Sequence, residues 1–555
     1  MRSRTASAGL LALCLLLVAC GGAAAPPTAT SQTTASAAAT ASASPSAQPK
    51  SMTVEVWSAF DSFNPATAQS GYDDTAISLM FDSLDWQSQD NQFHPLLASS
   101  WDISPDYKTY TFHIDPKANW TDGQPVTADD VAYTLQLNAD PKVPTKLGSF
   151  LSPLMGTDSS GQSTDPTQPL SGVKVVDAKT VQLIMKQPTD PNLLLSTLGN
   201  QLYIVPKHMV QNVADTDFVK APFFQNPTVT DGPFKFVKYL DTQYLQLAAN
   251  PNYYQGKPPI DQLYVKIVPP TSILPELRDG SIDATLTPGE SDVPLQDWPS
   301  LANLPNLKQD PVPGTTTQFM MINTAKPYLA TAQVRDAISM AINVPELVTS
   351  LLKGQGAVAN GPTLPLNTTY YDKALQPWPF DPAKAKQMLQ AAGFPFSQQL
   401  TLLVPTGNQI RQQSGPLIQQ DLQAVGLNVK IQQFDFATSL AQTKAGNFDF
   451  SLIGGFTVDP AGNSIYFACK GPLNYGKFCD PNLEKLFQAS DSTAVVADRQ
   501  KINDEIQQTL HDDAPFVFLY TPDGLMAYNT RVNQAAIPGA YGMLQPWLWD
   551  VSGPQ

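Results

Sequence analysis

Two oppositely charged residues have the types and positions suited to binding a ligand that carries charges of its own. Asp459 follows the apolar run Phe448–Ile453, which we expect to be a strand, and open α/β sheets bind ligands just beyond their strand ends. Arg411 has a planar guanidinium that can donate two parallel hydrogen bonds to a carboxylate. Two less specific interpretations stay open: Asp459 only caps the helix or turn that follows, and Arg411 is a solvated residue at a helix start.

The sequence contains none of the motifs that usually mark a catalytic or cofactor site. It has no P-loop, no GxGxxG after a strand, no GxSxG and no HExxH. Its 4 histidines are scattered, and no cysteine–histidine cluster has the spacing of a zinc site. We therefore predict a protein that is not an enzyme and needs no cofactor or metal. The alternative from the enzyme class, an exported hydrolase, would require a clustered triad or metal site that the sequence does not display.

Residues 1–20 have the features of an export signal. Two early arginines make the start positive, and the apolar run Gly9–Val18 is too short to stay in a bilayer as a span. Leu17-Val18-Ala19-Cys20 resembles the lipobox of bacterial lipoproteins, which implies that Cys20 is lipidated and becomes the mature N-terminus. Ordinary secretion without a lipid is the alternative. The prediction is a protein anchored by its lipid at the outer face of the cell membrane.

Residues 21–51 are mostly Ala, Ser, Thr, Pro and Gly, and they include no aromatic residue. Such a segment cannot bury enough apolar surface to fold, so we expect a disordered tether. It would reach about 30 Å as a random coil and about 90 Å when extended. That reach suits a folded body that stands away from a membrane.

The composition describes a folded body of two or three domains that does not bind nucleic acid. Of the 555 residues, 42% are hydrophobic and 15% charged, and the net charge is −15. Binding to nucleic acid or to anionic lipid needs clustered Lys and Arg, so the charge balance argues against both. Cys469 and Cys479 are the cysteines that remain beyond the leader. In an exported chain this pair suits a disulfide, whereas in a cytosolic chain it would be a metal or redox candidate.

The segment Leu96–Gln136 predicts a strand, a tight turn and a helix. Apolar and polar residues alternate over Tyr110–Ile114, which is typical of a half-buried strand. Trp120–Gly123 has the composition of a turn that ends in glycine. Thr127 precedes Ala-Asp-Asp, so it is expected to be the N-cap of a helix with acids in its first turn.

This segment resembles a signature of the solute-binding lipoproteins of bacterial ABC importers, in the peptide/nickel class. The tryptophan, the Tyr-Thr-Phe strand, the Trp-x-Asp-Gly turn and the Thr-Ala-x-Asp-Val helix start all fall in the register of that family. Family-like motifs recur from about residue 64 to about residue 519. The clearest are Asp231–Phe236, Ala249–Pro258, Leu277–Ala284, Val334–Asn343 and Phe380–Phe394.

The resemblance implies an α/β fold of the periplasmic-binding-protein class II, with two lobes that close about a hinge and an extra inserted domain. It implies a discontinuous domain I (52–95, 204–314 and 518–555), an inserted domain II (96–203) and a domain III (315–517). Strands that cross between the lobes are expected near Pro311–Thr315 and Pro515–Thr521. The lobes would close on the ligand, and the closed shape would be what the transporter recognises.

The resemblance also implies roles for individual residues. In peptide-binding relatives a Gly-Trp-x-x-Asp stretch supplies the aspartate that pairs with the amine of the peptide, which corresponds here to Asp459, with Phe456 in place of Trp. Arg411 falls where dipeptide-binding relatives carry an arginine for the C-terminus of the ligand. Gln69 and Tyr72 fall where the first domain of the family lines its cleft.

The implied function is capture of peptides outside the cell and delivery to a membrane permease and its ATPase, by a monomeric, lipid-anchored binding protein. Relatives on the same scaffold bind nickel chelates, oligosaccharides, opines or haem, and a sensory role beside a membrane receptor is also compatible with it. If Asp459 and Arg411 both face the cleft, a zwitterionic ligand fits best. If Arg411 points away, a longer peptide or a neutral glycan fits better.

Overall fold

The computed structural model describes residues 49–68, 70–88, 92–145, 147–289, 291–406, 408–455, 459–534, 538–539, 542–543 and 545–552. The elements below all belong to one unit, residues 49–555. The expected signal sequence and its Cys20 lie outside the described residues. Strand β1 begins at Ser51, the last residue of the segment that we expected to be disordered.

A mixed seven-stranded sheet has β1 (Ser51–Val56) near its centre, in the order β12-β19-β11-β1-β10-β9-β8. β1 pairs in parallel with β10 and β11, and the remaining pairs of the sheet are antiparallel. Along β9, half-buried and buried residues alternate, as in a strand with one face on the core. The other strands are β8 (Phe234–Leu240), β9 (Tyr244–Ala249), β10 (Gln262–Ile267), β11 (Ala284–Thr285), β12 (Leu307–Val312) and β19 (Gly524–Asn529).

A four-stranded antiparallel sheet, in the order β4-β5-β7-β6, contains the signature segment. Its strands are β4 (Ala98–Ile103), β5 (Thr109–Ile114), β6 (Val173–Asp177) and β7 (Thr180–Ile184). The predicted strand, turn and helix start are confirmed. Helix α2 (Ala128–Asn138) begins after Thr127, whose backbone N–H donates to the Asp130 carboxylate at 2.9 Å in a capping box.

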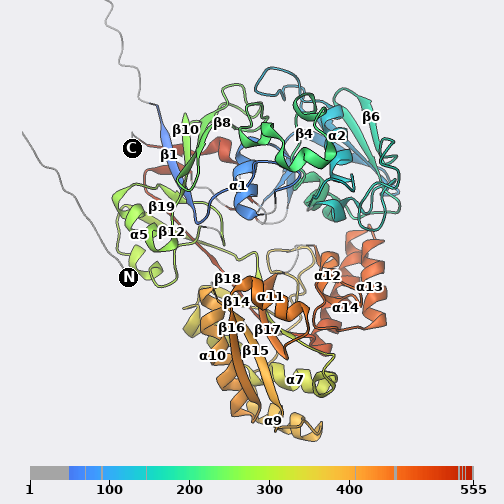
Figure 1. Ribbon diagram of the computed structural model, residues 1–555, viewed down its shortest axis with the longest axis vertical. Coiled ribbons are helices and arrows are strands. Elements are labelled where there is room, and N and C mark those ends of the chain that lie inside the picture. The colour runs from blue at the N-terminus through green and yellow to red at the C-terminus, as the bar shows by residue number, and fades with distance from the viewer. Residues whose placement is uncertain are drawn as a thin grey trace, which may run out of the picture. The chain divides into compact units, whose positions relative to one another are not determined.

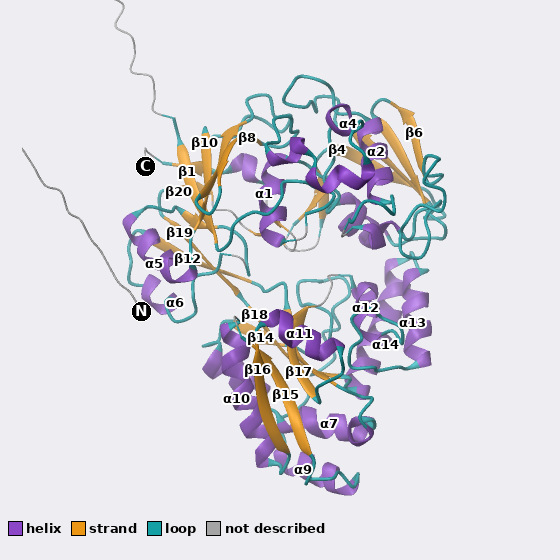
Figure 2. Cartoon of the chain, viewed as in Figure 1, coloured by secondary structure: helices purple, strands orange, loops and turns teal. Residues whose placement is uncertain are grey.

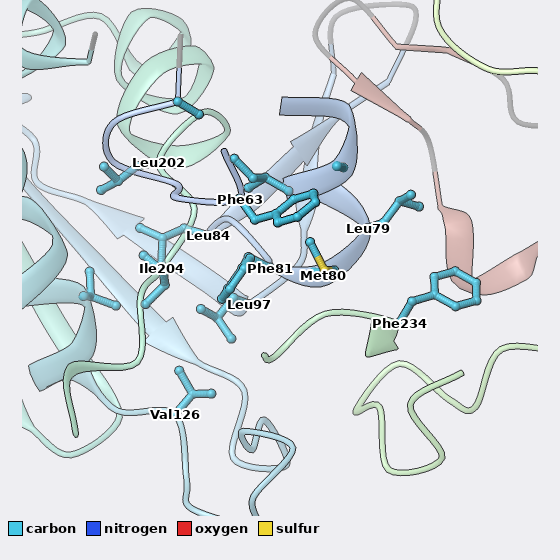
Figure 3. Close-up of a cluster of buried hydrophobic side chains, with 14 of the residues drawn as sticks. Phe63, Leu79, Met80, Phe81, Leu84, Leu97, Val126, Leu202, Ile204 and Phe234 are labelled. Carbon is cyan, nitrogen blue, oxygen red and sulfur yellow. The ribbon is translucent and has the colours of Figure 1, made fainter. Parts of the chain in front are cut away.

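One hydrophobic core joins these two sheets, so we call the elements around them the first lobe. The core contains Met52 and Val54 of β1 together with Tyr110 and Phe112 of β5. Figure 3 shows part of it, where Met80 and Phe81 lie among side chains from several segments of the lobe. The lobe also contains α1 (Gly71–Met80), η1 (Gly148–Leu151), α3 (Pro191–Leu194), η2 (Leu195–Gly199), α4 (Lys207–Val210), η3 (Asp215–Lys220), η4 (Pro222–Gln225), α5 (Pro270–Asp279) and α6 (Trp298–Leu301).

Helix α1 differs from a helix pattern that the sequence suggests over residues 75–84. It begins four residues earlier, because the Ser70 side chain accepts a hydrogen bond from the Asp73 backbone N–H at 3.1 Å and caps it. It ends at Met80, since Phe81 already has an extended backbone. Tyr72 therefore lies in the first turn of the helix, and Leu84 is buried in the core from outside it.

A mixed six-stranded sheet, in the order β14-β18-β13-β17-β15-β16, is the centre of what we call the second lobe (Figure 1). Parallel β15 and β16 are joined through helix α10, which is the expected α/β unit. The strands are β13 (Thr317–Ile322), β14 (Gly356–Val358), β15 (Gln399–Pro405), β16 (Asn428–Phe434), β17 (Phe450–Gly455) and β18 (Phe516–Pro522). The helices are η5 (Pro327–Leu329), α7 (Ala332–Ala341), α8 (Val344–Glu346), η6 (Leu347–Leu351), α9 (Pro382–Ala391), α10 (Gln409–Ala424), α11 (Phe436–Lys444), η7 (Pro460–Asn463), α12 (Ser464–Phe467), α13 (Pro481–Asp491) and α14 (Val496–Asp513).

Two short segments connect the sheets of the two lobes: residues 313–316 between β12 and β13, and Asp523 between β18 and β19. The first connection passes close to the end of β18, since a side chain at Gly314 would collide with the backbone of Pro522. The first connection overlaps the predicted crossing. The second connection, Asp523, lies two residues after the crossing predicted at Pro515–Thr521, because β18 continues to pair with β14 through Pro522.

The remaining elements are small, and Figure 2 shows how helices and strands are distributed over the two lobes. No helix in the described part of the chain has both the length and the apolar character needed to cross a bilayer. The small elements are the ladders β2 (Asp85–Gln87) with β3 (Phe93–Pro95), β20 (Val532–Gln534) with β23 (Asp550–Val551) and β21 (Pro538–Gly539) with β22 (Gly542–Met543), and the turn η8 (Pro546–Leu548).

Candidate functional site

Asp459 lies after strand β17, where the sequence predicts it, and directly before η7. Its carboxylate accepts two parallel hydrogen bonds from Arg499: Nη1 to Oδ2 and Nη2 to Oδ1, both at 2.7 Å. Arg499 belongs to α14 and its side chain is 0% exposed. Its Nε donates to the carbonyl of Ser490 at 3.0 Å. The sequence did not predict this internal partner for Asp459.

Arg499 also binds an acidic residue of the first lobe. Its Nη1 donates to Oδ2 of Asp190 at 2.6 Å, and the side chain of Asp190 is only 1% exposed. The other oxygen of Asp190 caps α3 by accepting from the Asn192 backbone N–H at 2.9 Å. Tyr370 of the second lobe donates its hydroxyl to Oδ2 of Asp190, and its ring centre lies 5.0 Å from the guanidinium carbon of Arg499. We call Asp190, Tyr370, Asp459 and Arg499 the interlobe cluster.

The charges around the interlobe cluster do not balance, because three carboxyl groups surround one guanidinium. Burial would lower the pKa of Arg499, but the Asp459 and Asp190 carboxylates outweigh it and raise that pKa well above its usual range. The third carboxyl is Asp491 at the end of α13. Surrounding protein and the charge of Asp459 raise the pKa of Asp491 to about 7, against the opposing effect of Arg499. Two carboxylates, Asp190 and Asp459, thus already bind the one guanidinium, and Asp491 adds a third carboxyl group at the same place.

A cavity of about 550 Å³ lies between the two lobes beside this cluster. Its first-lobe wall comes from the segments around η1, the end of β7, α3 and η2. Its second-lobe wall comes from the start of η7, from α12 and from the end of α13, and includes Asp459 and Asp491. The volume is within the range of about 300–1,000 Å³ that is usual for small-molecule sites.

Arg411 lies in the first turn of α10, in the same lobe as Asp459. The Asn408 side chain caps this helix by accepting from the Arg411 backbone N–H at 2.9 Å. The Arg411 guanidinium is not fully solvated: its Nε donates to Oε1 of Gln318 at 2.7 Å, and burial lowers its pKa. In the described part of the chain no carboxylate lies within ion-pair distance of it. A Cβ at Gly454 would lie 2.5 Å from Nη2 of Arg411, so the guanidinium packs directly against the backbone of this glycine.

The other predicted ligand-binding residues are less well characterised by the structure. Gln69 and Phe456 lie outside the described residues. Tyr72 is half-buried against the core of the first lobe. The ligand contacts predicted for Asp459, Arg411 and Tyr72 stay predictions.

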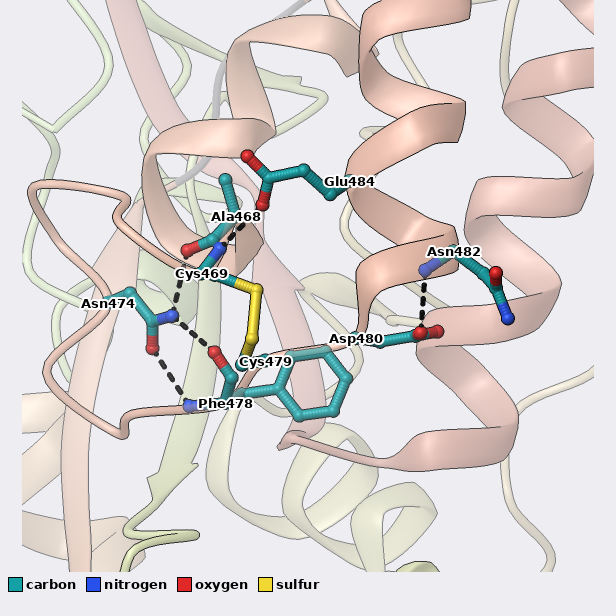
Figure 4. Close-up of a disulfide and its surroundings, with 8 residues drawn as sticks. All are labelled: Ala468, Cys469, Asn474, Phe478, Cys479, Asp480, Asn482 and Glu484. Atoms are coloured by element: carbon teal, nitrogen blue, oxygen red, sulfur yellow. Dashed lines mark hydrogen bonds between the residues drawn. A yellow bond between two sulfur atoms is a disulfide. The ribbon is translucent and has the colours of Figure 1, made fainter.

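Cys469 and Cys479 form a disulfide, with their Cα atoms 4.4 Å apart. Figure 4 shows how Asn474 braces the enclosed loop by donating to the carbonyls of Ala468 and Phe478, at 2.9 and 2.6 Å. Glu484 of α13 accepts from the Cys469 backbone N–H at 2.9 Å. The metal alternative for this pair is therefore not supported, and the described residues contain no group of three or more His, Cys, Asp or Glu arranged to hold a metal ion.

Sequence reasoning missed Asp190, Tyr370, Asp491 and Arg499. One signal was available for Arg499. The buried face of α14 contains Arg499, Asn503 and Gln507 in helical register with two apolar residues, Ile506 and Leu510. A polar residue on a core-facing stripe must meet a buried partner. Nothing in the sequence indicated that one partner of Arg499 is Asp190, more than 300 positions away.

Comparisons with known proteins agree with this architecture. The family model described as "Bacterial extracellular solute-binding proteins, family 5 Middle" matches residues 92–476. Di/tripeptide-binding protein 2 of Pseudomonas aeruginosa is 29% identical over 510 residues, which cover 87% of this chain and 91% of that protein. The oligopeptide-binding protein AppA of Bacillus subtilis is 26% identical over 437 residues, which cover 75% of this chain and 76% of that protein.

Solved structures show the same fold. The ABC transporter substrate-binding protein CtaP of Listeria monocytogenes superposes with a TM-score of 0.80 at 22% identity, covering 91% of this chain and 99% of that one. AppA of Bacillus subtilis in complex with a nonapeptide superposes with a TM-score of 0.74 at 22% identity, covering 91% of this chain and 100% of that one. The family match spans more than half of the chain, and the two-lobed α/β fold is the one that the sequence predicted. The chain belongs to the bacterial extracellular solute-binding proteins of family 5.

Proposed function

We propose that this protein is the substrate-binding component of an ABC importer and captures peptides outside the cytoplasmic membrane. The proposal rests on one observation: carboxyl groups outnumber cations at one place between the lobes, and a guanidinium of the second lobe lacks an ion-pair partner at another. Asp190, Asp459 and Asp491 lie around the one guanidinium of Arg499, whereas Arg411 has no carboxylate within ion-pair distance among the described residues. A peptide with free termini supplies the missing charge at each place, and relatives named for di- and tripeptide or oligopeptide binding support this choice of ligand.

In this proposal Asp459 binds the amino end of the peptide and Arg411 binds its carboxylate. The Arg411 guanidinium is packed against Gly454, which is five residues before Asp459. Five extended residues span at most about 17 Å, so the two charged ends of the ligand would be separated by a distance that a short peptide can cover. A desolvated charge needs an opposite charge, so both ends contribute to affinity only when each meets its partner. Gln69, Tyr72 and Phe456 are proposed to contact the ligand between or beside these ends.

The proposed mechanism is binding and release without chemical change of the ligand. The lobes, which correspond to the proposed domains I and II on one side and domain III on the other, rotate about residues 313–316 and Asp523. The closed shape is then recognised by the permease and its ATPase. A lipid on Cys20 and a flexible segment after it would keep the monomeric body near the transporter.

Calorimetry with chemically modified ligands tests this function without altering the protein. A tri-alanine peptide is compared with its N-acetylated form and with its C-terminal amide. We expect each modification to weaken binding at least tenfold, because a hydrogen bond to a charged group contributes about 1.5–3 kcal/mol. Equal affinity of the three ligands, or absence of binding by peptides of any length from two to nine residues, would contradict the proposal.

A further inference from the structure

The cavity between the lobes has two chemically different walls. The first-lobe wall combines six apolar residues with uncharged polar residues and, among the described residues, has no charged side chain. The apolar residues are Phe150, Pro153, Met185, Leu193, Leu194 and Leu198. The second-lobe wall carries two carboxyl groups, Asp459 and Asp491, next to Ser464 and Ile465. A ligand group with an apolar stem and a positive tip would therefore find apolar contacts on the first wall and an opposite charge on the second.

Asp491 has no partner of its own. Its side chain is exposed to the cavity, and its carboxylate accepts no hydrogen bond and forms no ion pair in the described part of the chain. The charged groups near Asp491 are Asp459 and Arg499, which already form an ion pair with each other. Asp491 is also the last residue of α13, where a carboxylate faces the negative end of the helix dipole. The Asp491 carboxylate is thus destabilised both by the lack of an ion-pair partner and by the helix dipole. A cation in the cavity would offset both effects.

We propose that this cavity binds the basic side chain of the amino-terminal residue of a peptide, with its aliphatic stem along the apolar wall and its cationic tip at Asp491. The inference rests on the proposed function and deepens it by naming a ligand class: peptides that begin with Lys or Arg. The assignment to the first residue follows from Asp459, which belongs both to the cavity wall and to the proposed site of the peptide amine.

The chemistry of the other side chains is less suited to the cavity. Lys and Arg bury their methylene groups on apolar surface while their charged heads reach a polar partner. A purely apolar side chain would displace water from the Asp491 carboxylate without replacing its hydrogen bonds. An acidic side chain would be repelled by Asp459 and Asp491 together. The cavity volume of about 550 Å³ leaves space for water around a cationic tip.

Calorimetry at pH 8, where Asp491 is ionised, tests the subsite with two tripeptides that differ only in one terminal group. Lys-Ala-Ala and norleucine-Ala-Ala have the same aliphatic stem, but only the first has a cationic tip. We expect the wild-type protein to bind Lys-Ala-Ala about tenfold more tightly, because a charge-assisted hydrogen bond is added. In Asp491→Asn this preference should fall to about onefold, because the substitution removes both the partner of the cationic tip and the desolvation cost that an apolar side chain meets at the carboxylate.

Asp498→Asn is the matched control, because it removes the same charge from an exposed residue of α14 whose one ion pair among the described residues is with Lys501, at 2.9 Å. It should keep the full preference for Lys-Ala-Ala. A preference near onefold in the wild type, its survival in Asp491→Asn, or its equal loss in Asp498→Asn would overturn the subsite. If neither peptide binds the wild-type protein, peptides of two to nine residues without a basic first residue decide between the two proposals: binding of any of them overturns the subsite, and binding of none overturns the proposed function instead. A thermal melt of each variant shows that the fold is intact, and Asp491→Asn should melt no lower than the wild type.

Discussion

Arg499 of the second lobe donates from Nη1 to Oδ2 of Asp190 in the first lobe at 2.6 Å, across 309 positions of sequence. Both side chains are buried, and the same nitrogen also donates to Asp459 at 2.7 Å. When the lobes separate, Asp190 regains water while Arg499 keeps its bidentate partner Asp459. The contact between the lobes therefore exchanges hydration of one carboxylate for two hydrogen bonds, from Arg499 and from Tyr370. In general the desolvation of a buried ion pair offsets much of its Coulombic attraction.

The first prediction concerns this interlobe ion pair. Asp190→Asn keeps a side chain able to cap α3 but removes the charge that Arg499 binds. We expect ligand affinity to fall about 10- to 100-fold, since a hydrogen bond between charged groups contributes about 1.5–3 kcal/mol. Small-angle X-ray scattering of the ligand-free variant should give a larger radius of gyration than the wild type. Asp102→Asn, which removes an exposed charge of the same lobe, serves as the control. Unchanged scattering and unchanged affinity in Asp190→Asn would exclude a role in closure.

The second prediction concerns Asp459. Its replacement by Asn leaves the shape of the residue but removes the charge, and it also deprives Arg499 of its bidentate partner. The loss of the partner of Arg499 affects binding of every ligand equally. The informative quantity is therefore the ratio of the affinity losses for two ligands that differ only at the amine. The variant should lose affinity for a free-amine peptide about tenfold more than for its N-acetylated form, as measured by calorimetry. Equal losses for the two ligands would mean that Asp459 serves only the interlobe cluster.

The third prediction concerns Arg411, whose guanidinium is partly buried without an ion-pair partner in the described residues. Arg411→Gln retains an N–H donor that can reach Gln318 but removes the charge. We expect binding of a peptide with a free carboxylate to weaken about 10- to 100-fold, and binding of the amidated peptide to change less than about threefold. The midpoint of thermal unfolding should not fall, because burial already disfavours the charged form. A lower midpoint together with equal losses for both ligands would indicate a structural arginine.

The fourth prediction concerns the pH dependence of stability. Asp82 accepts hydrogen bonds at Oδ2 from Tyr253 and Tyr254, at 3.0 and 2.6 Å, but burial raises its pKa to about 7. The folded protein therefore holds this proton more tightly than the unfolded chain does. The contribution of Asp82 to the free energy of unfolding is largest below about pH 4 and is lost as the pH rises to about 7. A shift from 3.8 to about 7 corresponds to about 4 kcal/mol.

Urea unfolding at pH 5 and pH 8 measures this effect. The Asp82→Asn variant should lose less stability between the two pH values than the wild type does. The neighbouring carboxyl of Asp231, whose pKa burial and Asp82 both raise, contributes in the same direction and is relieved by the same substitution. Glu505→Gln, which changes an exposed carboxylate, should behave as the wild type. Parallel pH profiles for Asp82→Asn and the wild type would contradict the prediction.

The fifth prediction concerns the disulfide that closes the loop after the cavity-lining residues of η7 and α12. Cys469 and Cys479 are 10 positions apart, and a crosslink over a loop of this length stabilises a protein by about 3 kcal/mol. The double substitution Cys469→Ser and Cys479→Ser should lower the midpoint of thermal unfolding. Adding a reductant should lower the midpoint of the wild type toward that of the variant and leave the variant unchanged. A wild-type protein insensitive to a strong reductant would show that the bond is absent or inaccessible in solution.

Elements with clear local signals were predicted well. The motif Phe380–Phe394 contains an aspartate, a proline and a late glycine in the order typical of a helix, and α9 has Asp381 as its N-cap and Gly393 at φ 66° after its end. The strand, turn and helix of Leu96–Gln136 followed for the same reason. The apolar stripe over residues 75–84 is less informative, because it continues past the end of α1: Phe81 and Leu84 are buried but lie outside the helix, and periodicity alone does not mark where a helix ends.

The candidate site was predicted only in part. Asp459 lies just beyond a strand end as expected, and Arg411 lies in a helix start with a half-buried guanidinium. The disulfide partners were identified from the export context. Asp491 gave no signal, because a lone acid at the end of a helix resembles any surface residue until a cavity is found beside it.

The sequence by itself determined the family, the α/β class and the local elements, because caps, turns and strand periodicities depend on residues within a few positions of one another. Only the tertiary structure decided which charges meet. Asp190, Tyr370, Asp459 and Arg499 come from four separate segments, and their contacts depend on how two lobes pack rather than on any local spacing. A buried charge has a large desolvation cost, so the identity of its partner is determined by three-dimensional proximity, which no local pattern in the chain records.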